Sequence, residues 1–380
     1  MLYYFPQEAS KTRYTWMMSR PGGWVEQRFV KHKIAFTRIN GTLLPGMDKN
    51  MSGPVLDCYQ RSHYSLTQVA KFIKMMQARK ITDTIPVLYF DDFWTPGIEA
   101  IPYCADQMGI PLALYSTLHA DSVDKHDFTY RMRHWKRSID KGISRFHTGL
   151  FVSAPLLQEL CEVAGIHATC LGLRFDSQAL LKRYVPPYGY NKNPLSFIFT
   201  SRFDQEKQPL LFLDFAQRMK SLVPGATFTM TSSHHTLRSN SPMIKMKILE
   251  AENSGLIRLR VNLTKQKYYN ALAESQYQVN CSLQDWVSNT LLEALTVRCI
   301  PIYPNCRSFP DVLDLEYLYK PGDVDSMVQV AQNAQFSDFK LNPIVKYHDG
   351  TLDRMLIEMG FLANLQDPKT KFKLRGKRHV

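Results

Sequence analysis

The sequence has no long apolar segment, no paired cysteine motif and no excess of acidic residues. No apolar run approaches the roughly 18–20 residues that span a bilayer, and MLYYFPQEAS lacks the basic and apolar regions of a secretory signal. The seven cysteines are scattered and none forms Cys-x-x-Cys, which argues against a disulfide framework or a zinc site. We therefore expect a protein of the reducing cytoplasm with no transmembrane segment.

Basic and hydrophobic residues, by contrast, are abundant. The 380 residues include 47 Lys and Arg against 34 Asp and Glu, for a formal net charge of +13. The hydrophobic fraction of 44% excludes a disordered chain, and the length predicts two domains at roughly 100–200 residues per domain. Many soluble proteins are simply basic, but the surplus favours a polyanionic partner: nucleic acid, anionic lipid or a phosphorylated substrate.

Short apolar runs alternate with amphipathic stretches along the first half of the chain. The patterns predict strands at 2–6, 32–39, 84–90, 110–116 and 148–154, and helices at 65–80, 97–109 and 154–165. Strand and helix in alternation predict a parallel sheet with helices on its faces.

The second half repeats this alternation after the proline-rich segment YVPPYGYNKNP. Strands are predicted at 195–201, 226–232, 277–282 and 299–304, and helices at 209–222, 265–275 and 288–298. The expected organisation is a first domain at 1–183, a linker at 184–194, a second domain at 195–350, a helix at 351–367 that crosses back to the first domain, and a basic tail at 368–380. The expected fold is α/β, with two Rossmann-like domains facing a cleft.

Two cations follow the first predicted strand of the second domain. Arg202 and Lys207 lie in the segment SRFDQEKQP, between that strand and the next helix. Ligands of open α/β sheets bind at the carboxyl ends of strands, and two cations there would suit a pyrophosphate. A solvated loop is the alternative interpretation.

A second polar segment is SLQDWVSNTLLEAL. It contains Asp285, a predicted helix start at Ser288, Asn289, Thr290 and Leu291, and then Glu293. The free N–H groups and the dipole of a helix N-terminus favour anions. A capped amphipathic helix with a surface Glu is the alternative.

Together these segments resemble the second domain of retaining GT-B glycosyltransferases. That family has an Arg and a Lys after the first strand of this domain, as in SRFDQEKQP, and two acids separated by seven residues, as Asp285 and Glu293 are. The first acid is usually Glu, so Asp285 is a departure with a shorter reach. The resemblance covers about 195–320 well, and the first half only by general pattern.

The resemblance implies a GT-B fold and a role for each matching residue. Arg202 and Lys207 would neutralise the diphosphate of a nucleotide sugar, which we expect to be UDP-linked. Backbone or hydroxyl groups of Ser288, Asn289, Thr290 and Leu291 would bind phosphate. Glu293 would bind the ribose, and Asp285 would hold the transferred sugar. No metal and no further cofactor would be required.

The first half offers weaker candidates. His119 and Asp121 follow a strong predicted strand, where the family often has a His near the donor; Asp121 would orient the acceptor or act as a base. Gly22 and Gly23 resemble a glycine-rich loop that lets phosphate approach the backbone, although they lie far from the first strand. The pair Asp91-Asp92 is interpreted as a strand-end turn with a packing or capping role.

The acceptor is expected on the first domain, which is basic. Residues 125–145 hold seven Lys and Arg against two Asp, with interleaved aromatics. Such a surface suits phosphates and stacked bases, with a solvated basic helix as the alternative. The nucleic-acid-binding candidates are Lys125, Arg131, Arg133, Trp135, Lys136 and Arg137.

We therefore expect a monomeric retaining glycosyltransferase that modifies hydroxymethylated pyrimidines in double-stranded DNA, like the sugar transferases of bacteriophages. Three alternatives stay open. One is a lipid or saccharide acceptor at the membrane, and another is a modified tRNA base. The third is an inactive, nucleic-acid-binding relative, although Arg202, Lys207 and Glu293 are all present.

Overall fold

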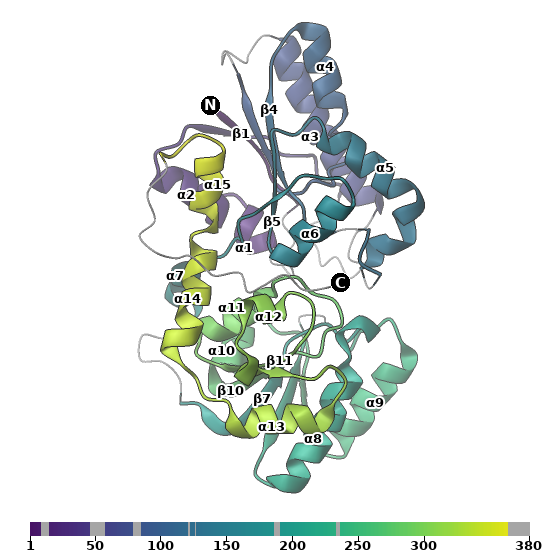
Figure 1. Ribbon diagram of the computed structural model, residues 1–380, viewed down its shortest axis with the longest axis vertical. Coiled ribbons are helices and arrows are strands. Elements are labelled where there is room, and N and C mark those ends of the chain that lie inside the picture. The colour runs from purple at the N-terminus through teal and green to yellow at the C-terminus, as the bar shows by residue number, and fades with distance from the viewer. Residues whose placement is uncertain are drawn as a thin grey trace. The chain divides into compact units, whose positions relative to one another are not determined.

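The computed structural model describes residues 1–8, 15–45, 58–78, 85–120, 122–125, 127–185, 191–232 and 236–363. The chain divides into two compact units, each described by itself below (Figure 1). Unit 1 contains residues 1–174 and the segment that begins at Gly350. Unit 2 contains Phe175–Asp349.

Unit 1 is built on a parallel sheet of six strands in the order β2-β1-β3-β4-β5-β6. From β2 the chain returns to the other side of β1, so the strand order reverses between β1 and β3. Ligands of open parallel sheets bind beyond the carboxyl ends of strands at such a switch point. The strands are β1 (Leu2–Phe5), β2 (Phe36–Arg38), β3 (Val87–Phe90), β4 (Ala113–Thr117), β5 (Gly149–Val152) and β6 (Thr169–Cys170).

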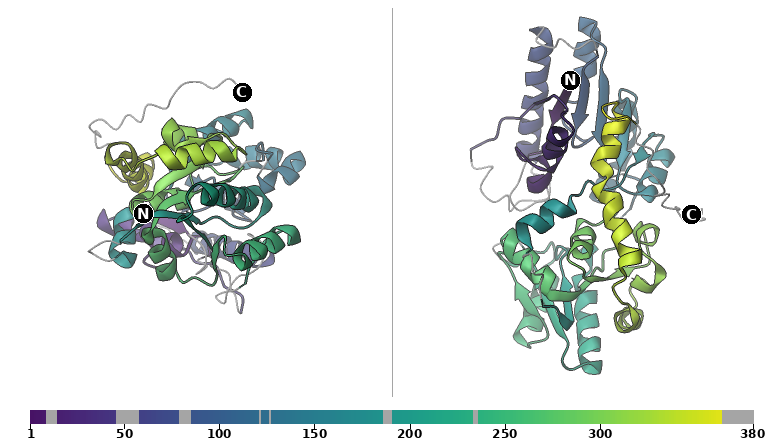
Figure 2. Two further views of the ribbon diagram at one scale, coloured as in Figure 1. Left: turned by 90° about the horizontal axis from the view of Figure 1, so that it is seen from below. Right: turned by 90° about the vertical axis from the view of Figure 1, so that its left-hand side faces the viewer.

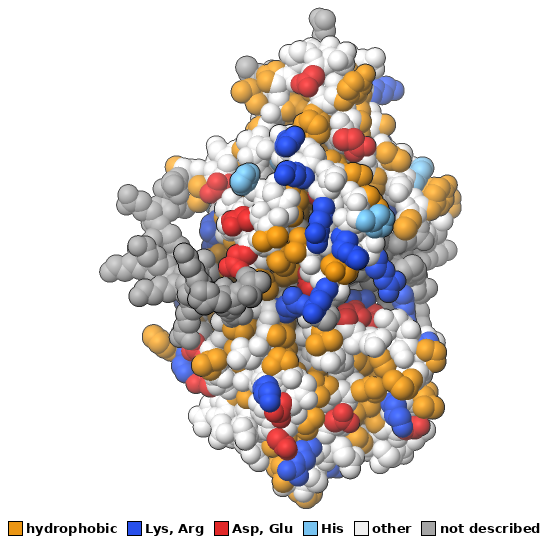
Figure 3. Space-filling view, turned by 45° about the vertical axis from the view of Figure 1, so that its right-hand side comes forward, with side chains coloured by type: hydrophobic (Ala, Val, Ile, Leu, Met, Phe, Trp, Pro, Cys, Tyr) orange, Lys and Arg blue, Asp and Glu red, His pale blue; other side chains and the backbone are white. Residues whose placement is uncertain are grey.

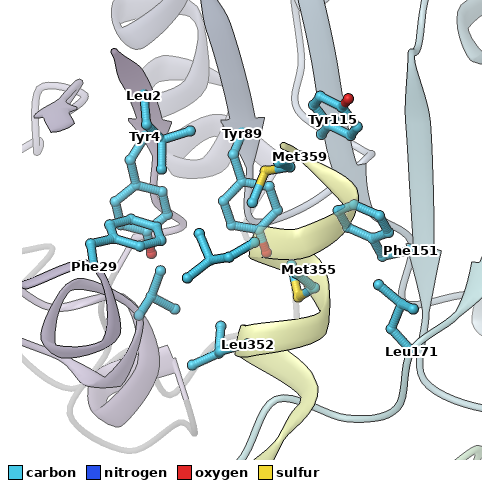
Figure 4. Packing of buried hydrophobic residues seen from close by; sticks show 12 residues of the cluster. Leu2, Tyr4, Phe29, Tyr89, Tyr115, Phe151, Leu171, Leu352, Met355 and Met359 are labelled. Atoms are coloured by element: carbon cyan, nitrogen blue, oxygen red, sulfur yellow. The ribbon is translucent and has the colours of Figure 1, made fainter. Parts of the chain in front are cut away.

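Helices cover both faces of this sheet, because alternate side chains of a strand point to opposite faces. Tyr3 and Phe5 pack against α3, whereas Leu2 and Tyr4 pack in a second cluster with α2 and α15 (Figures 2 and 4). The last helix of the described chain thus completes the core of the first unit. The helices are α1 (Thr15–Ser19), α2 (Trp24–Lys31), α3 (Cys58–Gln77), α4 (Ala100–Met108), η1 (Phe128–Met132), α5 (Arg133–Ser144), α6 (Pro155–Val163) and α15 (Thr351–Glu358).

Unit 2 has a second six-stranded parallel sheet, in the order β12-β11-β10-β7-β8-β9. The order reverses between β7 and β10, so these two neighbours flank the switch point of this unit. Phe197 of β7 stacks on Phe228 and Tyr277 of the adjacent strands, which fixes the centre of the core. The strands are β7 (Asn193–Phe199), β8 (Thr227–Thr231), β9 (Arg258–Arg260), β10 (Ser275–Val279), β11 (Ile300–Pro304) and β12 (Leu318–Tyr319).

The helices of unit 2 form two groups. Helix α8 contacts α9 and α13, whereas α11 contacts α7 and α14. They are α7 (Ser177–Tyr184), η2 (Gln205–Lys207), α8 (Pro209–Leu222), α9 (Pro242–Asn253), α10 (Lys265–Glu274), α11 (Asn289–Thr296), α12 (Phe309–Val312), η3 (Leu315–Tyr317), α13 (Val324–Asn333) and α14 (Asp338–Asp349). No helix in the described part of the chain is long and apolar enough to cross a membrane.

The units divide between Arg174 and Phe175, earlier than the predicted linker at 184–194. The reason is the packing of α7, which precedes that linker. Its Tyr184 stacks on Tyr269 of α10 with ring centroids 4.7 Å apart, and its first backbone N–H donates to Asp349. Residues 186–190, in the middle of the predicted linker, lie outside the described residues, as does the basic tail.

Candidate functional site

The strongest candidate site lies at the switch point of unit 2. The loops that follow β7 and β10 carry the two polar segments singled out in the sequence. The two loops also contact each other, because the N–H of Leu283 donates to the carbonyl of Glu206 at 2.9 Å. This brings η2 and the segment before α11 together at the carboxyl edge of the sheet.

Lys207 is the buried cation of this edge. Its ammonium donates to the carbonyl oxygen of Gln284 at 2.6 Å and lies 3.5 Å from Oδ2 of Asp285. Only 11% of its side chain is exposed, so the charge is directed toward the loop after β10 rather than into solvent. Gln208, which follows it, has a left-handed backbone with a φ of 46°, and Pro209 then begins α8.

Arg202 is the exposed cation of the same loop. Its guanidinium donates to Asp204 and Glu206, at 2.7 Å in each case. Half of the side chain is exposed, and both acids lie on its own loop. Arg202 is therefore held at the rim, where an incoming anion can compete with these carboxylates.

The N-terminus of α11 has two free donors. Ser288 precedes the helix, and its hydroxyl contacts that of Thr290 at 2.7 Å instead of capping a backbone group. In the described part of the chain, the backbone N–H groups of Asn289 and Thr290 have no hydrogen-bond acceptor. Two N–H groups at the positive end of a helix form a suitable site for an oxyanion.

Glu293 lies one turn into α11 and is held by two neighbouring tyrosines. Tyr269 donates to its Oε1 at 2.6 Å, and Tyr268 donates to its Oε2 at 2.7 Å. Burial raises the pKa of Glu293, an effect opposed by these hydrogen bonds and by the charge of Lys265. Burial and the adjacent carboxylate raise the pKa of both tyrosines, so they stay protonated donors.

Buried polar atoms lie next to these groups, along β10 and just after it. Oε1 of Gln278, Nδ2 of Asn280 and Oγ of Ser282 are fully buried and have no hydrogen-bond partner among the described residues. Buried polar groups are normally satisfied by protein or by ordered water. The carboxyl end of β10 therefore offers donors and acceptors to water or to a bound molecule.

The switch point of unit 1 is occupied by a buried ion pair. Asp91, directly after β3, is fully buried and accepts hydrogen bonds from Arg174, from Tyr4 at 2.6 Å and from Ser19 at 2.6 Å. These partners hold the pKa of Asp91 below its usual value although burial acts to raise it. The interpretation of Asp91-Asp92 as a strand-end turn with a packing role agrees with these contacts.

His119 lies beside this ion pair, after β4. Its Nε2 is 2.8 Å from the carbonyl oxygen of Asp91 and 3.5 Å from the guanidinium of Arg174. Burial lowers the pKa of His119, so the neutral ring donates from Nε2 to the carbonyl. Asp121, predicted beside it, lies outside the described residues.

Gly22 and Gly23 form a tight turn before α2. Gly22 has a φ of 64°, and its N–H donates to Glu26 at 2.7 Å. A Cβ on Gly23 would lie 2.5 Å from the carbonyl oxygen of Met18. Close backbone packing alone therefore accounts for Gly23, and the N–H of Gly22 already has a partner within the turn.

The basic segment of unit 1 forms η1 and α5, and one of its predicted nucleic-acid contacts has to be corrected. Lys136 is 1% exposed, lies 3.4 Å from the ring centroid of Trp94 and pairs with Asp140. It is buried because it lies on the inward face of α5, so it cannot reach a ligand. The other five candidates are exposed: Lys125, Arg131, Arg133, Trp135 and Arg137.

Sequence reasoning missed the tyrosines that hold Glu293 and the Asp91–Arg174 pair. The segment KQKYYN predicts only a helix, and Arg174 lies in no recognisable motif. The spacing of Lys136 and Asp140 indicates that these two side chains pair with each other, because residues four apart lie on the same side of a helix. No group of three or more His, Cys, Asp or Glu side chains in the described part of the chain could hold a metal ion.

No family model matches the sequence. Solved structures are similar over most of the chain. A sucrose-phosphate synthase from Thermosynechococcus elongatus matches with a TM-score of 0.59 at 11% identity, covering 94% of this chain and 97% of that one. HepE from Anabaena, in complex with UDP, matches with a TM-score of 0.55 at 12% identity, covering 93% and 94%.

A trehalose 6-phosphate synthase from Burkholderia multivorans matches with a TM-score of 0.53 at 10% identity, covering 80% of this chain and 77% of that one. These similarities agree with two parallel sheets of six strands, each with helices around it. The chain thus has the GT-B fold, as predicted from its sequence.

Proposed function

We propose that this protein is a glycosyltransferase that moves a sugar from a UDP-linked donor to a hydroxyl acceptor, with retention of anomeric configuration. One observation carries the proposal. A buried ammonium, two free N–H groups and a tyrosine-held carboxylate gather at the switch point of unit 2. The UDP complex of the similar protein HepE supports the choice of nucleotide.

The cations and the helix terminus act on the diphosphate. As the acceptor oxygen bonds to the anomeric carbon, the bond from that carbon to the diphosphate oxygen breaks. The electron pair of the broken bond stays on UDP, and the hydroxyl proton is released. Lys207, Arg202 and the N–H groups of Asn289 and Thr290 stabilise the charge that develops on the departing diphosphate.

The acids bind hydroxyl groups. A carboxylate has about four lone-pair sites, so Glu293 can accept from the two tyrosines and still accept from both ribose hydroxyls. Asp285, 3.5 Å from Lys207, holds a hydroxyl of the transferred sugar near the diphosphate.

For the acceptor we propose a hydroxymethylated pyrimidine in double-stranded DNA. The net charge of +13 and the exposed basic residues of η1 and α5 support a polyanion. A base inside a duplex is reached by flipping it out, at a cost of a few kcal/mol.

The donor chemistry is tested by substitution. Glu293→Ala and Lys207→Ala should strongly reduce transfer without changing the fold, as judged by circular dichroism. Glu274→Ala and Lys267→Ala are the controls, because both side chains are exposed on α10. Unchanged turnover in the first two variants would overturn the site assignment.

The acceptor is tested with labelled UDP-sugars offered separately to hydroxymethylated DNA, tRNA and membrane extract. Label in DNA alone supports the proposal. Label only in tRNA, lipid or saccharide would replace the DNA acceptor by that class. DNA binding without any UDP binding or transfer would indicate an inactive relative.

A further inference from the structure

Helix α5 and the residue directly after it carry a regular series of exposed cations. Arg133, Arg137, Lys141 and Arg145 follow one another at intervals of four residues, and we refer to them as the cation ladder. Each member lies about one turn further along the helix and about 40° further around it, so the ladder extends over about 18 Å while turning about 120° around α5. Figure 3 shows Lys and Arg side chains gathered in a band on the face that contains α5.

The charges of the ladder are not paired with carboxylates of the described residues. In the described part of the chain, none of its four members takes part in a salt bridge. Arg133 donates to the carbonyl of Tyr130 and Arg137 to that of Ser122, both neutral groups. Like charges four residues apart destabilise a helix, so the ladder has an energetic cost that an anionic partner would remove.

A buried cluster defines which side of α5 faces the protein interior. Lys136 and Asp140 are buried, and Nε1 of Trp94 donates to Asp140 at 3.0 Å. This cluster holds the helix to the loop after β3. Since successive residues are about 100° apart around a helix, the side opposite this cluster contains His134, Ser138 and Arg145.

We propose that the cation ladder binds the phosphate backbone of the nucleic acid that carries the acceptor base. The inference rests on the proposed acceptor and adds its docking surface. Each strand of a duplex presents a charge about every 3.4 Å, which is closer than the roughly 6 Å rise between successive members of the ladder. Trp135 and Ile139, both about half exposed, lie on the side of α5 opposite Arg137.

The balance of side chains on α5 favours a nucleic acid over a lipid surface. A helix that docks on a membrane inserts bulky apolar side chains among the acyl chains. Within α5, the exposed bulky apolar residues are Trp135 and Ile139, whereas the ladder supplies four cations. Charge should therefore dominate the contact, and vesicle binding in the test below separates the two partners.

The test is the salt dependence of DNA binding. The wild-type protein and R133Q/R137Q are titrated with a labelled duplex containing hydroxymethylcytosine between about 50 and 200 mM salt. The variant should bind more weakly, and its plot of log affinity against log salt should be shallower by about 2, because two phosphate contacts are lost. Its midpoint of thermal unfolding should change little, because the removed repulsion offsets the lost hydrogen bonds to the carbonyls of Tyr130 and Ser122.

R218Q/K247Q is the matched control. It removes the same formal charge from exposed residues of α8 and α9 that are paired with Asp325 and Glu250. Its salt slope should equal that of the wild type. A slope for R133Q/R137Q equal to the control's overturns the inference. An unchanged salt slope for DNA, together with lost binding to phosphatidylserine vesicles, would also overturn the inference.

The donor chemistry is measured separately on the same three proteins. UDP binding and slow hydrolysis of the UDP-sugar should be equal in the wild type, R133Q/R137Q and R218Q/K247Q. Absence of UDP binding in the wild type would overturn the proposed function, whereas the ladder is judged by the DNA slopes alone. A wild type that binds UDP but no DNA would overturn the ladder and the DNA acceptor together.

Discussion

Tyr269 donates its hydroxyl hydrogen to Glu293, with Oη 2.6 Å from Oε1. Tyr269 also stacks on Tyr184, so the donor is fixed by packing as well as by its hydrogen bond. The carboxylate of Glu293 therefore has a defined orientation before any nucleotide binds. Such preorganisation lowers the cost of binding, since fewer side chains have to be ordered in the complex.

Replacing Glu293 by Ala should weaken UDP binding about 10- to 100-fold, since hydrogen bonds to a charged group contribute about 1.5–3 kcal/mol. Isothermal titration calorimetry measures the change. Y269F is an informative companion, because it keeps the carboxylate and removes one of its two donors. Equal affinities of wild type and Glu293→Ala would contradict the ribose-binding role.

Ionisation of Glu293 should lower the free energy of unfolding at neutral pH. Because its pKa is raised in the folded protein, the folded state binds the proton more tightly than the unfolded state. Stability from this group is therefore complete below the unfolded pKa, about 4.3, and is lost as pH rises through the folded pKa. Relative to Glu293→Gln, the wild type should become less stable as pH rises from 4 toward 7; thermal midpoints that keep a constant difference would contradict this.

Lys207→Ala should lower kcat/KM by roughly 100-fold or more, the usual cost of removing one preorganised group that stabilises developing charge. Lys207→Arg should recover little, because the ammonium fits against the Gln284 carbonyl at 2.6 Å in a buried position. Arg202→Ala should have the smaller effect, since Arg202 is half exposed. The reverse order of effects, measured by steady-state kinetics, would contradict the assignment of Lys207 as the main cation.

Asp140→Ala should destabilise unit 1 by about 3–5 kcal/mol, because the ammonium of Lys136 would stay buried without its carboxylate. The double variant K136M/D140L should lose much less, since it buries no charge. Urea unfolding followed by circular dichroism compares the two. If the double variant were the less stable one, the ion pair would have to contribute specific packing beyond charge compensation.

His119 should stay neutral below its ordinary pKa. Burial lowers its folded pKa from 6.5, so the unfolded chain binds the proton more readily. Stability from His119 is present above pH 6.5 and is lost as pH falls through the lowered folded pKa. The thermal midpoint of the wild type should therefore drop relative to His119→Gln on acidification below pH 6.5; a rise would indicate a stabilised imidazolium.

Most of the sheet scaffold could be predicted from the sequence, because buried parallel strands are short apolar runs between turn residues. Each predicted strand corresponds to an observed one, although its ends differ. Strands β6 and β12 have two residues each, too few to show a pattern. Helix α14 contains Pro343, which disguises its helical period.

The site could be predicted in part, and the missing part has a physical reason. Arg202, Lys207 and Glu293 stand in local motifs, and the sheet brings their loops to one edge. Tyr269 reaches Glu293 across 24 positions of sequence, and Asp91 reaches Arg174 across 83. Contacts of that separation depend on tertiary packing, which local periodicity does not encode.

The return of the chain to unit 1 at Gly350 has a consequence for biosynthesis. Leu352, Met355 and Leu356 of α15 belong to the core that also contains Leu2 and Tyr4 of β1. The ribosome makes one part of this core before unit 2 and the other part after it. Unit 1 therefore lacks α15 until unit 2 has been synthesised, and we expect unit 2 to complete its fold first. This would be an exception to the general order, in which the domain made first also folds first.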